Sequence, residues 1–343
     1  MRTRRLLGWA LFCSSCTLSE PLLPTSESAD GSANSSPDFA GVQDFCNATD
    51  PRAVAPWVWA TPEAGEKPYV DLLKSAQKSI RVEIYLMGYG GILDTLKQKA
   101  SAGVSVKVIL DQGEPPNQKY FDELKAAGAQ VLWNDPKFPY MHAKFIVVDD
   151  GKAMVSTGNF SLKVGILQER NFMAQLADPA DVADLVALFD ADWQRQKPDM
   201  SCTRLLISPI NSRPRLLDLI RSASQTLTLE SMQFADTEVR AAVQTRHAAG
   251  VKIRALLADA TWIAANAEAA SFLKSLGIPV KSIPHLHTKV VVVDGQRAYL
   301  GSANLSFTSL SKNREVGLIL TEASSLKPLV DTFEKDWAAG QDF

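Results

Sequence analysis

The amino-acid sequence contains the same set of polar residues twice, at the same spacing. In "MHAKFIVVDDGKAMVSTGNFS" a lysine follows the histidine by two positions and an aspartate follows it by seven, with an asparagine ten positions after the aspartate; "LHTKVVVVDGQRAYLGSANLS" repeats this order. Chance would produce the His-Lys-Asp spacing at a given histidine roughly once in a few hundred, yet two of only four histidines show it. The candidate reactive residues are therefore His142, Lys144, Asp149 and Asn159 in the first set, and His287, Lys289, Asp294 and Asn304 in the second.

These residue types suit the binding of a phosphate group. Each histidine and lysine opens an apolar run that predicts a β-strand, so both side chains project from the same face of the sheet. A buried lysine is costly without a counter-charge, and phosphate oxygens would supply one. The asparagine amides and the hydroxyls of Thr157 and Ser302 are suitable further contacts for phosphate.

Two histidines that face one phosphorus atom can divide the work of a phosphodiester reaction. One attacks phosphorus as a neutral imidazole and forms a phosphohistidine, while the other protonates the leaving oxygen and then activates water. Lysines and asparagines stabilise the charge on the equatorial oxygens, so the scheme requires no metal ion or other cofactor. His285 and His287 form a His-x-His pair, but Tyr140 stands at the place of His285 in the first set, which disfavours a metal site.

The repeat extends well beyond these two motifs. "VWATPEAGEKPYVDLLKSAQKSIRVEIYLM" aligns with "LLISPINSRPRLLDLIRSASQTLTLESMQF", and Glu83 then matches Glu230; for both glutamates we favour a structural hydrogen-bonding role over a catalytic one. A similarity held over about 140 residues indicates a duplicated domain. In the first copy the patterns predict helices at 69–78, 92–102 and 118–127, and strands at 80–87, 105–111, 130–133, 144–149 and 153–156.

Near-continuous Val, Ile and Leu runs suit strands that are covered by helices on both faces. The expected fold class is therefore α/β, as a duplicated α/β/α sandwich whose two halves are related by a pseudo-two-fold axis. The predicted division is an export signal at 1–16, a flexible linker at 17–52, a first half at 53–198 and a second half at 199–343. We expect a monomer with its site between the two halves.

The first sixteen residues have the composition of an export signal. Three arginines precede a short apolar run and then small residues, and Cys16 stands where a bacterial lipoprotein would be lipidated, so lipid attachment and simple cleavage are both open. The expected location is the periplasm, the outer membrane as a lipoprotein, or the medium. Cys46 and Cys202 could form a disulfide in an exported protein or remain two separate thiols.

The doubled motif resembles the signature of the phospholipase D superfamily, H-x-K-x4-D-x6-G-S-x-N. The second copy fits throughout, including Gly301 and Ser302, whereas the first copy has Ser156-Thr157 in place of Gly-Ser. The resemblance implies the duplicated sandwich fold and a phosphohistidine mechanism without a metal ion. It covers the chain from about residue 53 to its end.

The resemblance also suggests roles for single residues. In many relatives the first-motif histidine is the nucleophile, which would make His142 the nucleophile and His287 the acid. A glutamate downstream of the motif orients a histidine in the family, and Glu315 in "NREVG" fits. The matching residue in "ERNFM" is Asn171, so this support is either lost there or supplied by Glu169. The motif aspartates are expected to support the structure rather than to transfer protons.

The substrate is expected to be a phospholipid at a membrane surface, hydrolysed in the manner of a phospholipase D. Aromatic residues just before His142 could rest among lipid headgroups, although they could equally be packed core or stack on bases. Usual bacterial cardiolipin synthases are longer and begin with transmembrane helices, which favours hydrolysis over synthesis. The alternatives are an exported nuclease that cleaves DNA or RNA, and a phosphatidyltransferase. The net charge of −2 gives no basic surface for nucleic acid at the level of the whole chain.

Overall fold

The computed structural model describes residues 47–343. The predicted export signal, Cys16 and Cys46 lie outside the described residues. Cys202 is disulfide-bonded. The predicted linker runs to residue 52, but Arg52 is buried and its Nε lies 2.6 Å from Asp181 Oδ2. The packed part of the chain therefore starts before residue 53, because this arginine has a buried acidic partner.

Two mixed β-sheets form the framework, and they share one strand order. The seven-stranded sheet runs β1 (Trp57–Thr61), β7 (Asn171–Leu176), β6 (Lys152–Ser156), β5 (Lys144–Val148), β2 (Ser79–Ile84), β3 (Ser105–Leu110) and β4 (Gln130–Trp133). The eight-stranded sheet runs β8 (Leu206–Ser208), β14 (Glu315–Leu320), β13 (Arg297–Gly301), β12 (Lys289–Val293), β9 (Thr226–Ser231), β10 (Lys252–Ala258), β11 (Val280–Ile283) and β15 (Gln341–Asp342).

Helices follow the strands in the same order in each half. The first half has α1 (Lys67–Lys74), α2 (Gly91–Ser101), α3 (Asn117–Ala126), a π-helix (Leu162–Ile166) and α4 (Pro179–Trp193). The second has α5 (Ser212–Arg221), α6 (Thr237–Ala248), α7 (Ala265–Ser275), α8 (Phe307–Ser311) and α9 (Ala323–Ala339). Asp178 caps α4 and Asp236 caps α6 by accepting hydrogen bonds from backbone amides of the first turn, the usual role of aspartate at a helix start.

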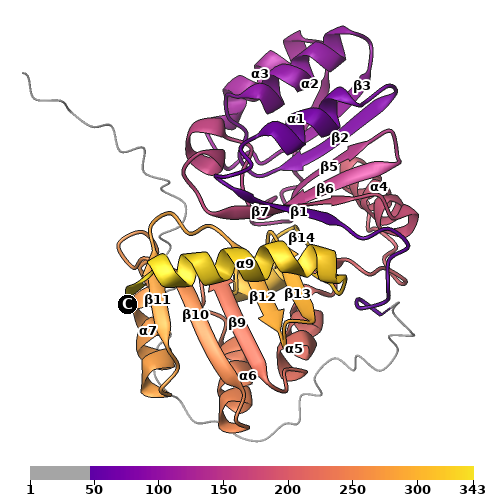
Figure 1. Ribbon diagram of the computed structural model, residues 1–343. Coiled ribbons are helices and arrows are strands. Elements are labelled where there is room, and N and C mark those ends of the chain that lie inside the picture. The colour runs from indigo at the N-terminus through magenta and orange to yellow at the C-terminus, as the bar shows by residue number, and fades with distance from the viewer. Residues whose placement is uncertain (1–46) are drawn as a thin grey trace, which may run out of the picture. The chain divides into compact units, whose positions relative to one another are not determined.

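The motif strands are buried on both faces. In β12, Val291 and Val293 pack in the core beneath α5, α6 and α7, whereas Val290 and Val292 pack in a central core with α4 and α9. The strand β5 divides its side chains in the same way, between the central core and the core that α1, α2 and α3 cover. Figure 1 shows α1, α2 and α3 side by side against the first sheet.

The predicted fold class is confirmed, including the duplication. The predicted helices correspond to α1, α2 and α3, and the predicted strands to β2 through β6. The flanking strands β1 and β7, paired antiparallel, are not among the sequence predictions. No helix within residues 47–343 combines the length and the apolar character needed to cross a membrane.

Candidate active site

The two motif histidines lie just before the two buried motif strands, and each is held by backbone from the other half. The amide of His142 donates to the carbonyl of Arg314 at 2.9 Å, and the amide of His287 donates to the carbonyl of Arg170 at 3.0 Å. The amide of Arg314 donates in turn to Tyr140, and that of Arg170 to His285, each at 3.0 Å. The backbone of the two halves therefore interlocks at both histidines.

Arginine side chains continue this interlock into the core. Arg314 is buried and its guanidinium lies 2.7 and 2.8 Å from the two carboxylate oxygens of Asp192 on α4. Arg170 lies 2.6 and 3.0 Å from those of Asp336 on α9. Each arginine thus reaches from its own half to the last helix of the other, and bidentate pairs of this kind fix orientation as well as charge.

His142 is oriented by a carboxylate. Its Nδ1 lies 3.0 and 2.9 Å from the two oxygens of Glu315, which is fully buried at the start of β14. Because Nδ1 carries the proton that points to Glu315, Nε2 is left as the free nitrogen. The rings of His142 and Tyr85 also pack edge to face, with 4.8 Å between the ring centres.

His287 is oriented by an amide. Its Nδ1 lies 2.9 Å from Oδ1 of Asn171, while the nearest oxygen of Glu169 is 3.5 Å away. Asn171 is itself fixed, since Thr157 Oγ1 donates to its Oδ1 at 2.9 Å and its Nδ2 donates to the Gly165 carbonyl at 3.1 Å. Asn171 occupies the position matching Glu315, and its amide contacts His287 directly. The carboxylate of Glu169 is farther from the imidazole.

The two motif lysines are fully buried beside the histidines. Lys144 Nζ donates to the His142 carbonyl at 2.7 Å, and Lys289 Nζ donates to the His287 carbonyl at 2.5 Å and lies 3.2 Å from His287 Nδ1. Burial lowers the pKa of His142 to about 4, with Glu315 opposing the shift and Lys144 adding to it. Burial and the charges of Lys289 and Lys144 lower the pKa of His287 well below its usual range. An anion bound between the lysines would reverse part of both shifts.

Asn159 and Asn304 present unsatisfied polar atoms. The Oδ1 atom of each is buried and has no hydrogen-bond partner within residues 47–343. Buried polar atoms are normally hydrogen-bonded. Within the described residues these two carbonyl oxygens lack the partner that a buried amide oxygen usually has. Each asparagine follows the last strand of its motif, β6 or β13.

The prediction that Thr157 and Ser302 bind phosphate directly does not match their contacts. The Thr157 hydroxyl donates its proton to Asn171 and accepts from the amide of Phe172. The Ser302 hydroxyl accepts from the amide of Val316 at 3.0 Å and donates to the Val316 carbonyl at 3.3 Å. A hydroxyl has one proton to donate. Thr157 uses it on Asn171, which contacts His287, and Ser302 uses it on the backbone of Val316, the residue after Glu315.

The motif aspartates bind backbone at the far ends of the motif strands. Asp149 accepts hydrogen bonds from the amides of Gln77, Lys78 and Ser79 at 2.7 to 2.8 Å, and Asp294 accepts from Ser224, Gln225 and Thr226 at 2.8 to 3.2 Å. Both have positive φ angles, of 51° and 54°. They hold the turn after the motif strand onto the start of the neighbouring strand and are not grouped with the histidines.

The first-copy departure at Ser156 has a local explanation. Gly301 is closely approached, because a Cβ there would lie 2.5 Å from the Tyr299 hydroxyl and 2.6 Å from Gly317 Cα. In the first half that room is available, and Ser156 Oγ is 2.7 Å from the Tyr69 hydroxyl and accepts from the Gly158 amide at 3.0 Å. The serine is therefore accommodated by a tyrosine that comes from a different element.

Four residues near the histidines are absent from the sequence prediction. They are Arg170 and Arg314, Tyr85 beside His142, and Trp262, whose ring centre is 6.1 Å from that of His287. The sequence could have revealed the two arginines, because the repeat aligns them and each directly precedes the residue that orients a histidine. The aromatic residues are not repeated, so the sequence offered no signal for them.

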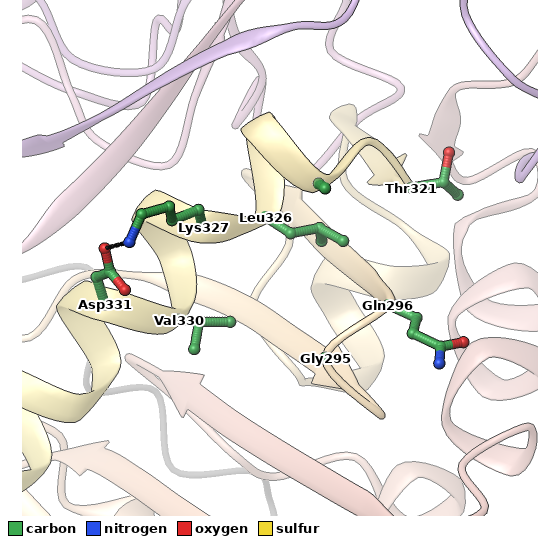
Figure 2. A pocket seen from close by; sticks show the side chains of 8 residues that line it. Gly295, Gln296, Thr321, Leu326, Lys327, Val330 and Asp331 are labelled. Atoms are coloured by element: carbon green, nitrogen blue, oxygen red, sulfur yellow. Dashed lines mark hydrogen bonds and ion pairs between the residues drawn. The ribbon is translucent and has the colours of Figure 1, made fainter.

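A surface pocket lies away from the histidines. A pocket of about 380 Å³ is lined by Gly295, Gln296, Thr321 and residues of α9, among them the ion pair of Lys327 and Asp331 at 2.6 Å (Figure 2). None of its lining residues belongs to the histidine site. Within residues 47–343, no three His, Cys, Asp or Glu side chains are grouped so as to hold a metal ion.

Comparison with known proteins places both halves in one family. The family described as "Cardiolipin synthase, PLD-like domain" matches residues 69–193 and 216–337. A cardiolipin synthase of Geobacillus thermodenitrificans is 26% identical over 321 residues, which cover 78% of this chain and 63% of the relative. The chain therefore spans less than two thirds of the length of that relative.

Two further comparisons bear on the fold and on the family. A mitochondrial cardiolipin hydrolase of Canis lupus familiaris is 28% identical over 163 residues, covering 46% of this chain and 64% of the relative. The crystal structure of a phosphatidylserine synthase of Haemophilus influenzae superposes with a TM-score of 0.68 at 13% identity, covering 87% of this chain and 88% of that one. The structural likeness supports the duplicated fold.

Proposed function

This chain belongs to the phospholipase D superfamily, in the PLD-like domain family of the cardiolipin synthases, and from that premise we propose that it transfers phosphatidyl groups between alcohols. The observation that carries the proposal is the pairing across the halves, in which Glu315 orients His142 and Asn171 orients His287. Two buried lysines beside these imidazoles suit a phosphodiester. Transfer is preferred to hydrolysis because the cardiolipin synthase and phosphatidylserine synthase comparisons extend over most of the chain, whereas the hydrolase match covers less than half.

His142 acts as the nucleophile in this scheme. Its Nε2 attacks phosphorus, an Nε2–P bond forms, and the bond from phosphorus to the leaving oxygen breaks in line with it. The resulting imidazolium carries a positive charge that the carboxylate of Glu315 stabilises through Nδ1. The carboxylate stabilises His142 throughout the life of the phosphohistidine, when this ring is a fixed cation. His287 only transfers a proton and does not need the same charge beside it.

His287 acts as the acid and then as the base. Protonated while the lipid phosphate is bound, it gives its proton to the leaving alcohol oxygen; it then takes the proton of the incoming alcohol, whose oxygen attacks phosphorus and releases His142. Asn171 accepts from Nδ1 without adding a full charge, which leaves the imidazolium a readier proton donor than a carboxylate partner would.

Lys144, Lys289 and the amide groups of Asn159 and Asn304 stabilise the equatorial oxygens of the phosphate. Each lysine is buried next to a motif histidine, so its charge acts in a site where water screens little. The amide Nδ2 groups supply further donors. In this proposal the two lysines and two asparagines do the work for which many phosphoryl-transfer enzymes use metal ions.

We also propose that the protein acts at a membrane surface after export. The support is the composition of residues 1–16, with three arginines ahead of a short apolar run. We further propose that the two halves meet between residues 198 and 199, that each carries one motif, and that the protein is a monomer with one site between the halves. Lipid attachment at Cys16 is checked by mass spectrometry of the protein from membranes.

The test uses the chain without its first sixteen residues, with EDTA, phosphatidylglycerol vesicles, 1-butanol and a single-stranded oligonucleotide. We expect cardiolipin and phosphatidylbutanol, and neither product with His142→Ala. Lys327→Ala, in the pocket of Figure 2, serves as the control that keeps activity. Phosphatidic acid alone would make the protein a hydrolase, and a cut oligonucleotide with unchanged lipid would make it a nuclease.

A further inference from the structure

The surroundings of His287 differ from those of His142. The ring of Trp262 lies 6.1 Å from the His287 ring with 30° between their planes, and 6.1 Å from the ring of His285. Trp262 is partly buried and packs on an apolar cluster that contains Met232 and Leu286. An indole face therefore borders the imidazole that handles the proton.

In the other half, polar residues lie beside His142 where the indole of Trp262 lies beside His287. Asn117 and Asn266 make equivalent backbone contacts, which places Gly113 at the position of Trp262. The neighbouring Glu114 accepts a hydrogen bond from the hydroxyl of Tyr85 beside His142. Asp111 is also buried there. The two sides of the site are therefore chemically different, although the motifs themselves are repeated.

In an in-line substitution, the leaving group and the incoming group use the same side of phosphorus. The group that leaves phosphorus and the group that replaces it both lie opposite the attacking nitrogen of His142, and both exchange a proton with His287. An acceptor that reaches the phosphohistidine must therefore pass beside His287, where Trp262 lies. Water and alcohols compete for this position, and an apolar ring favours the molecule with carbon atoms.

We propose that Trp262 determines acceptor choice, by favouring alcohols over water at the phosphohistidine; this rests on the proposed phosphatidyl transfer. The alkyl part of an alcohol packs against the indole, and its hydroxyl is left facing Nε2 of His287. The ring also occupies volume that would otherwise admit water. Trp262 is thus a specificity residue. It sets how much of the phosphohistidine reacts with alcohol and how much reacts with water.

The experiment measures that division. Phosphatidylglycerol vesicles are incubated with the enzyme in 1-butanol and water of fixed composition, and phosphatidylbutanol and phosphatidic acid are quantified by mass spectrometry. Both products arise from one intermediate, so their ratio does not depend on the amount of active enzyme. Trp262→Ala and Trp262→Phe are compared with wild type, and Trp57→Ala, which removes an exposed indole on β1, is the matched control.

We expect Trp262→Ala to lower the ratio of butanol product to water product by roughly tenfold, the scale of losing apolar contact with a substrate. Trp262→Phe should lie between this variant and wild type, and Trp57→Ala should match wild type. An unchanged ratio in either folded Trp262 variant would overturn the inference while transfer by the wild type stood. A wild type that forms only phosphatidic acid would instead remove the proposed transfer itself, and the inference with it.

Discussion

The Nδ1 atom of His142 lies within 3.0 Å of both carboxylate oxygens of Glu315, a residue from the other half of the chain. At His287 the amide oxygen of Asn171 takes the equivalent place at 2.9 Å, and the nearest carboxylate oxygen, from Glu169, is 3.5 Å from Nδ1. The two histidines of the repeat are therefore electrostatically unequal. The proposed chemistry uses that inequality at the phosphohistidine stage, when His142 is held as a cation that the carboxylate of Glu315 stabilises.

Replacing Glu315 by glutamine should reduce the rate of transfer by up to about 10⁴-fold, the scale of loss when a carboxylate that orients a catalytic histidine becomes an amide. The amide keeps the shape of the side chain but removes the negative charge that stabilises the phosphorylated imidazolium. Rates with phosphatidylglycerol vesicles measure the loss. Glu123→Gln, at an ion pair with Lys97 remote from the motifs, should leave the rate unchanged. A Glu315→Gln enzyme of normal rate would contradict the assigned role.

Replacing Asn171 by aspartate should move the alkaline limit of activity to higher pH. A carboxylate beside Nδ1 favours the imidazolium form of His287, so its pKa rises and the acid keeps its proton to higher pH. The pH profile of kcat/KM tests the sign. Gln296→Glu adds the same charge at the exposed pocket of Figure 2 and should not move the limit. A shift to lower pH would mean that His287 is not the acid.

The interlock between the halves predicts a large loss of stability for Arg314→Leu. The substitution leaves Asp192 buried without its bidentate partner, which costs about 3–5 kcal/mol in the free energy of unfolding. Arg221→Leu breaks an exposed pair with Asp218 and should cost at most about 1 kcal/mol. Urea unfolding of the two variants gives the comparison. Equal losses would show that the buried pair does not hold the halves together.

Sequence reasoning could reach the fold and the reactive residues because the repeat exposes them. His142 and His287 stand before near-continuous valine and isoleucine runs, and the alignment of two copies distinguishes shared function from chance. Burial on both faces of β5 and β12 follows from the same runs. The structural role of Asp149 and Asp294 was also within reach, since neither lies on the strand face of the histidine.

The contacts that cross between the halves were not within reach. Arg170 and Arg314 pair with aspartates in the other half, and no local pattern says which helix an arginine will meet. The hydroxyl of Thr157 likewise had an obvious external partner in phosphate, but the fold gives it the side chain of Asn171 instead. Trp262 occurs in only one copy, so the repeat could not single it out.

The buried glutamate Glu83 should make the wild type lose stability as pH rises. Its carboxyl has no hydrogen-bond partner within residues 47–343, and burial, with the nearby charge of Asp192, raises its pKa well above the usual value of 4.5. The folded chain therefore keeps this proton where the unfolded chain has lost it. The associated stability is complete below the unfolded pKa and is lost as pH rises through the folded pKa.

Glu83→Gln has no proton to lose, so its stability relative to wild type should be greater at pH 8.5 than at pH 5. Melting temperatures of both proteins at the two pH values provide the measurement. Glu230→Gln in the second half should behave alike, because Glu230 is also buried without a partner in that range and burial raises its pKa. A difference that is the same at both pH values would mean that Glu83 is already ionised in the fold.

The two copies also differ at the residue before the motif hydroxyl, and exchanging that residue should be asymmetric. Gly301→Ser places a Cβ 2.6 Å from Gly317 Cα and 2.8 Å from the Val316 carbonyl. Both contacts are backbone atoms of β14, which cannot move away without shifting Glu315 at the start of that strand. Overpacking of this kind costs about 1–3 kcal/mol. Ser156→Gly removes a hydroxyl that bonds Tyr69 and Gly158 and should cost about 1 kcal/mol. Activity should follow the same order, because Gly317 and Val316 are continuous with the residue that orients His142. If Gly301→Ser were as stable and active as wild type, the close approach at β13 and β14 would not be what keeps glycine in the second motif.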